Sequence, residues 1–147
     1  MKAYTEWTTE ELWQQEQVNF SAHIAIMFHY LQTHGLDPAD FTRYAGEAVL
    51  PSWKRRGGTV ADMMQGILRN VLANGGSVEA VTIGERQAEA TVSSLLRLDV
   101  MERYGIPAEQ AERFWDKFIP IGQALGIRFT RKELDGGRNQ IVLERIA

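Results

Sequence analysis

Several residues that could contact a ligand lie on predicted helices and on one predicted strand. His23, Met27 and Tyr30 recur at three- and four-residue steps, which place side chains at neighbouring positions of one helix. Pockets for small molecules are commonly lined by apolar and aromatic side chains with a few polar groups. The sequence therefore predicts an apolar or aromatic pocket. Its candidate ligand-binding residues are His23, Met27, Tyr30, Tyr44, Glu47, Ala90 and Trp115.

Core packing is the alternative explanation for the aromatic residues, because aromatic side chains at helical spacing usually fill cores. Glu47 interrupts the apolar side of a predicted helix between Tyr44 and Leu50, which indicates either a polar anchor for a ligand or an exposed position. Ala90 is a small residue on the inward side of a predicted strand. Its size leaves room for a cavity or for a closely packed helix, and both interpretations stay open.

Catalytic and metal-binding motifs are absent from the sequence. His23 and His29 are six residues apart, about 240° around a helix axis, so one face does not present both to a metal ion. The sequence contains no His-Glu-x-x-His pattern, no phosphate-binding glycine loop and no Gly-x-Ser-x-Gly turn. We therefore predict no metal site, and the sequence specifies neither a cofactor nor a reaction.

Composition restricts the class of protein. The chain of 147 residues has 44% hydrophobic and 24% charged residues, as expected for a single soluble domain spanning residues 1–147. Its net charge of −3 argues against nucleic-acid binding, which relies on a basic surface. The sequence contains no cysteine, and no apolar run approaches the ~20 residues that span a bilayer. These properties predict a cytoplasmic protein without a membrane segment.

Capping and periodicity signals predict a helical layer over residues 1–76. Thr8 starts a capping-box pattern, and a helix of about 25 residues follows without Pro or Gly. Asp37 before Pro38 and Thr59 are N-cap signals of two further helices, separated by a basic loop at 54–58. The apolar stripe predicted for the first helix consists of Trp13, Phe20, Ile24, Met27 and Leu31.

The sequence pattern of residues 77–147 predicts a ββαββ unit. Alternating residues form one hairpin over 78–96 and a second over 127–146 with a turn at 135–137, and an amphipathic helix over 107–125 lies between them. Pro120 predicts a kink in that helix. The expected fold class is α+β, with the N-terminal helical layer packed on a four-stranded antiparallel sheet made of the two hairpins.

The C-terminal half resembles a known family. The resemblance rests on the strand end 92–96, the segment 104–107 before a helix, the segment 111–115 within it and the closing hairpin 136–144. These segments look like proteins of the L-2-amino-thiazoline-4-carboxylic acid hydrolase-like family and, more distantly, like 4-vinyl reductase domains that bind small molecules. Those families commonly carry cysteines where this chain has Ser93, Ser94 and Gln140. The resemblance therefore implies a fold and a pocket rather than thiol chemistry.

Two further classes of function remain beside a small-molecule-binding or sensory domain. The family resemblance implies a hydrolase-like enzyme as the alternative. A helix followed by a basic, glycine-tipped hairpin is also typical of a winged-helix DNA-binding protein, but Glu109, Glu112 and Asp116 would repel DNA from that helix.

The first helix has more apolar surface than one stripe requires, since Ala22, Ala25, Ile26 and Phe28 add to the stripe. It therefore predicts a homodimer formed through the N-terminal helix.

Overall fold

The first helices start where the local capping signals predict. In the computed structural model, which describes residues 6–146, α1 (Thr9–Thr33) begins with a complete capping box between Thr8 and Glu11. α2 (Pro38–Ala48) is capped by the Asp37 carboxylate, which accepts a hydrogen bond from the Ala39 amide at 2.9 Å. α4 (Val60–Ala73) is capped by Thr59. Each cap satisfies amide donors that a helix start otherwise leaves unpaired.

The predicted basic loop at 54–58 is only partly a loop. Residues 54–56 form the end of α3 (Leu50–Arg56), and Gly57, at φ 117°, ends this helix. Pro51 lies in the first turn of α3, where its missing amide hydrogen costs nothing. The proline therefore starts a new helix after α2 and extends the helical layer into the basic segment.

The helix predicted between the two hairpins is divided into shorter pieces. The predicted helix over 107–125 consists of α6 (Ala108–Glu112), the 3-10 helix η2 (Arg113–Lys117) and α7 (Phe118–Leu125), and a separate short helix, α5 (Leu98–Arg103), precedes it. The tighter η2 turn precedes Pro120, which has no amide hydrogen for an α-helical bond to residue 116. The irregularity predicted from Pro120 is thus present as a change of helix type.

The two hairpins form one antiparallel sheet, as predicted. The strands are β1 (Val78–Ile83), β2 (Gln87–Val92), β3 (Ile127–Glu133) and β4 (Asn139–Arg145), with the short 3-10 turn η3 (Asp135–Gly137) between the last two. The spatial order is β1-β2-β4-β3. β2 therefore pairs with β4, and the two hairpins are joined through their inner strands.

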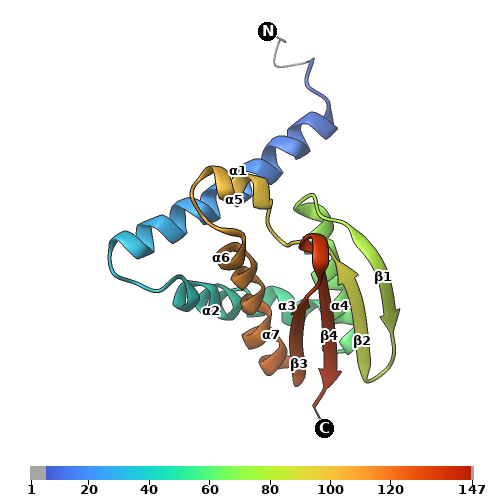
Figure 1. Ribbon diagram of the computed structural model, residues 1–147. Coiled ribbons are helices and arrows are strands. Elements are labelled where there is room, and N and C mark those ends of the chain that lie inside the picture. Colours follow the sequence, from blue (N-terminus) through green and yellow to red (C-terminus); the bar gives the residue numbers. More distant parts are fainter. Residues whose placement is uncertain (1–5, 147) are drawn as a thin grey trace.

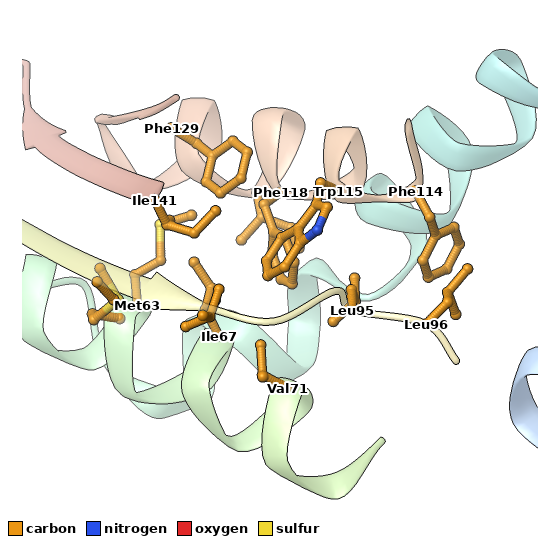
Figure 2. Close-up of a cluster of buried hydrophobic side chains, with 14 of the residues drawn as sticks. Met63, Ile67, Val71, Leu95, Leu96, Phe114, Trp115, Phe118, Phe129 and Ile141 are labelled. Atoms are coloured by element: carbon orange, nitrogen blue, oxygen red, sulfur yellow. The ribbon is translucent and has the colours of Figure 1, made fainter. Parts of the chain in front are cut away.

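Helices cover one face of this sheet, which confirms the predicted α+β architecture. α4 packs on β1, β2 and β4, while α7 packs on β3 (Figure 1). The core between these layers is filled by aromatic and aliphatic side chains, including Trp115, Phe118, Met63 and Ile67, each at most 1% exposed (Figure 2). α1 runs across the end of the molecule and packs against α5 and α2.

Candidate functional site

The helix-covered face of the sheet changes from apolar to polar along its length. Because side chains alternate between the two faces of a strand, the register defines rows of residues on the covered face. Charged and amide side chains occupy the rows nearest the η3 turn, where Asn139 is buried, Arg131 is partly buried and Glu133 is exposed. Beyond the row Ile127–Arg145, the next three rows toward the η3 turn are Ala88–Leu143–Phe129, Ala90–Ile141–Arg131 and Val92–Asn139–Glu133.

A buried polar network lies at the polar end of this face. Asn139 donates from Nδ2 to Glu112 Oε2 at 2.8 Å, and Arg131 donates from Nη1 to Asn139 Oδ1 at 3.0 Å. Arg131 also lies 3.8 Å from Glu112 and 3.1 Å from Glu133. Glu112 is 6% exposed and Asn139 is fully buried. A carboxylate, an amide and a guanidinium are thus held together at the end of an otherwise apolar core.

Three short elements position the network. Glu112 is the last residue of α6, Arg131 belongs to β3, and Asn139 is the first residue of β4. The turn before Asn139 contains Gly136 and Gly137, both at φ 71°, a conformation that residues with a Cβ rarely adopt. The Asp-Gly-Gly sequence therefore allows the tight turn that brings Asn139 opposite Glu133 and below Glu112.

The network lies beneath a groove between α5, α6 and the β3–β4 turn. One part of the groove has a volume of about 450 Å³ and a second part about 250 Å³, and they share Leu98 and Gly137. Figure 1 shows the turn and α5 at the same end of the sheet. We call this feature the sheet-end groove. The larger part is lined by Leu98, Ala108, Glu109, Glu112, Arg113, Glu133, Leu134, Gly137 and Arg138.

The smaller part of the groove contains the two serines that stand where the resembling families have cysteines. Ser93 Oγ accepts from the Ser77 amide at 2.9 Å, and Ser94 Oγ donates to the Gly137 carbonyl at 3.3 Å. Both hydroxyls therefore tie the end of β2 to its neighbours. Gln140, the third such position, lies on the opposite face of the sheet and donates to Glu89. The serines and this glutamine do not form one cluster.

Two of the predicted ligand-binding residues belong to the packed core. Ala90 is 1% exposed and pairs with Ile141, and Trp115 is fully buried and stacks on Phe129 with ring centroids 6.4 Å apart. Trp115 Nε1 has no hydrogen-bond partner within the described residues. The small side chain of Ala90 thus accommodates close packing, the second of the two interpretations that the sequence allowed.

The other five predicted residues are exposed and do not join Ala90 and Trp115 around a cavity. His23, Met27 and Tyr30 lie on the outer side of α1, and Tyr44 is 68% exposed on α2. Glu47 lines a different cleft, of about 490 Å³, between α2 and the η2–α7 segment. An enclosed pocket between α1 and the sheet is therefore not formed by these seven residues.

The phase of α1 explains this difference. The buried side of α1 consists of Gln17, Ser21, Ile24, Ala25 and Phe28, so it shares Ile24 with the predicted apolar stripe but excludes Met27. Ser21 Oγ accepts from the Arg97 amide at 2.9 Å, so a polar residue is satisfied on the buried side. Phe20 and Ile24 of the predicted stripe do pack in or against the core. Since apolar residues occur on both sides of this helix, however, periodicity alone also includes Trp13 and Met27, which are exposed.

Sequence reasoning did not identify the network residues as a site. By sequence pattern alone, Glu112 falls on the polar side of the predicted helix over 107–125, and Arg131 is one of the basic residues of the second predicted hairpin. One signal was present: Arg131 and Glu133 continue the alternation of Ile127 and Phe129, which places charged side chains on the inward face. The position of Glu112 above that face depends on how α6 packs, and no local pattern specifies it.

A second buried charge lies in the helical layer. Lys117 Nζ is 4.8 Å from the centroid of the Phe114 ring and 5.1 Å from that of Phe118. Burial away from water disfavours the ammonium form and lowers the pKa of Lys117 to about 8. Lys117 does not line the sheet-end groove. We therefore treat it as a feature of the core rather than of the site.

Comparisons with known proteins supply no assignment for this geometry. The chain matches no protein-family model, no curated protein and no solved structure. Over residues 6–146, no three His, Cys, Asp or Glu side chains are grouped so that they could hold a metal ion. No helix in the same range has the length and apolar character needed to cross a membrane. The function is therefore argued from the sheet-end groove alone.

Proposed function

We propose that this protein is a small-molecule-binding domain whose ligand occupies the sheet-end groove. The observation that carries the proposal is the buried Glu112–Asn139–Arg131 network directly beneath the groove. The groove also has apolar walls at Leu98 and Leu134. Small-molecule sites typically combine apolar walls with a few fixed polar groups, and a volume of 300–1,000 Å³ is usual.

A contribution to folding stability does not readily explain the buried Glu112–Asn139–Arg131 network. Moving charged groups out of water is costly, and well-packed apolar residues of similar volume often serve stability as well or better. The neighbouring rows of the same sheet face are apolar, with Ala88, Leu143 and Phe129 in one of them. A polar end on an apolar face therefore favours a role in recognition.

The proposal keeps the class of function expected from the sequence and moves its site. The sequence predicted an apolar or aromatic ligand held between α1 and the sheet. The sheet-end groove lies instead beside α5 and α6, and it offers both apolar walls and polar groups. A sensory role would require that ligand binding alters a contact of α5, α6 or the η3 turn, because these elements surround the groove.

A fragment screen with matched tryptophan variants tests the site. Ala108 lines the groove on α6, and Ala124 is an equally exposed alanine on α7 outside it. In NMR fragment screening of the parent protein, we expect bound fragments to shift the amide signals of Gly136 and Gly137. In Ala108→Trp, the same fragments should no longer shift these signals. Ala124→Trp should bind like the parent. Fragments that bind elsewhere, or bind Ala108→Trp equally well, would contradict the proposal.

We also propose that α1 pairs with α1 of a second copy. Its outer side carries Ile26, Met27 and Tyr30 at exposures of 52%, 40% and 61%. Exposed apolar clusters of this kind are common at protein interfaces. Sedimentation at tens of micromolar should give a dimer for the parent and for Gln65→Glu on α4, and a monomer for Ile26→Glu. A monomeric parent would overturn this assembly.

A further inference from the structure

The buried carboxylate beneath the groove has one oxygen free for a ligand. Glu112 Oε2 accepts from Asn139 and faces Arg131, whereas no protein group in the described part of the chain donates to Oε1. Glu112 is 6% exposed and lines the groove. Because Oε1 is not a buried atom without a partner, it reaches the groove, and a carboxylate oxygen in this position is a strong acceptor for a charged hydrogen-bond donor.

The charges around the groove leave carboxylates in excess. Arg131 is shared between Glu112 and Glu133 and does not itself line the groove. The three arginines that do line it are already paired: Arg97 with Asp99 at 2.8 Å, Arg113 with Asp116 at 3.0 Å, and Arg138 with Glu79 at 3.1 Å. Glu109 is a further lining carboxylate, and it forms no ion pair within residues 6–146. The potential in the groove therefore favours a cation.

The remaining lining groups indicate what kind of cation fits. The described side chains provide no cluster of ligands that could hold a metal ion. Leu98, Ala108 and Leu134 offer apolar surface beside the carboxylates. An organic cation uses both features, because its apolar body contacts these side chains while its charged head donates to Glu112. We infer that the sheet-end groove selects small organic ammonium ions over neutral and anionic molecules of the same shape.

This inference rests on the proposed function and is tested with three probes of nearly equal shape. Benzylammonium, benzyl alcohol and benzoate are titrated separately into the ¹⁵N-labelled full chain at pH 7, and the amides of Leu134, Gly136 and Gly137 report on the groove. We expect benzylammonium to bind at least about tenfold more tightly than benzyl alcohol, and benzoate to bind least, because only the cation forms a charge-assisted bond with Glu112.

Isosteric variants separate recognition from folding. Glu112→Gln keeps an acceptor for Asn139 and removes the charge, so benzylammonium affinity should fall to that of benzyl alcohol, whose own affinity should stay constant. Glu102→Gln changes an exposed carboxylate on α5 that does not line the groove and should have no effect. If benzyl alcohol or benzoate binds as tightly as benzylammonium, the cation preference is wrong and the binding function stands. If no probe or screened fragment perturbs the groove, both fail.

Discussion

The two ends of the covered sheet face share the same three strands and are built from opposite chemistry. At one end, Phe129 and Leu143 pack with Trp115 in a buried apolar core. At the other end, Arg131 and Asn139 hold the carboxylate of Glu112 beneath an open groove. The backbone pairing is antiparallel and continuous across both ends. The difference shows that the side chains, and not the strand pairing, distinguish the apolar end, which stabilises the fold, from the polar end, where we propose that a ligand binds.

The largest expected effect concerns the apolar end. Trp115→Ala should lower the free energy of unfolding by about 3–5 kcal/mol, because it leaves a cavity among fully buried side chains. Urea denaturation measures this loss. Trp7→Ala, which truncates a tryptophan that is 48% exposed, is the control and should cost far less. Similar losses for both variants would mean that the apolar end is not the stabilising one.

The polar end should respond differently to partial and complete replacement. Arg131→Met should cost about 2–4 kcal/mol, since it leaves Glu112 buried without its cation. The triple variant Glu112→Leu, Arg131→Met, Asn139→Leu should recover most of that loss, because it leaves no unpaired charge in the interior and Glu133, whose side chain is 59% exposed, stays in contact with water. Denaturation of both variants gives the comparison, and the triple variant should no longer bind fragments. A triple variant less stable than Arg131→Met would assign the network a structural role.

The cation buried near the apolar end should make stability depend on pH. The pKa of Lys117 is lowered from 10.5 to about 8, so between these values the unfolded chain holds a proton that the folded chain has released. The contribution of Lys117 therefore destabilises below pH 8 and is relieved as the pH rises to 10.5, by up to about 3 kcal/mol. Lys117→Met should be more stable than the parent at pH 7, and the gap should close by pH 10.5. A gap constant with pH would contradict this.

The smallest expected effect is at the rim of the groove. Arg138 and Glu79 form an exposed ion pair, and such pairs contribute about 0–1 kcal/mol. Arg138→Gln should leave the unfolding midpoint almost unchanged. It should, however, tighten or preserve the binding of benzylammonium, because it removes a positive charge beside the groove. Weaker binding of the cation in this variant would indicate that Arg138 takes part in recognition.

Much of the fold follows from interactions between residues close in sequence. Thr8, Asp37 and Thr59 cap helices because their side chains reach amides two or three residues ahead. The alternation of apolar and polar residues predicted both hairpins, and hairpins that need further pairing join into one sheet. Such signals survive in the sequence because each depends on only a few neighbouring positions.

The candidate site depends on contacts between residues far apart in sequence. Glu112, Arg131 and Asn139 meet only because the end of α6 packs over β3 and β4, and their order in the sequence does not specify that packing. The outer side of α1 was likewise decided by tertiary contacts, since Ser21 is buried against the Arg97 amide while Met27 is exposed. The sequence by itself therefore determined most of the elements and the sheet, but not α3 or the division of the 107–125 helix. The tertiary structure decided which face each element buries, because burial is a property of the whole packed chain.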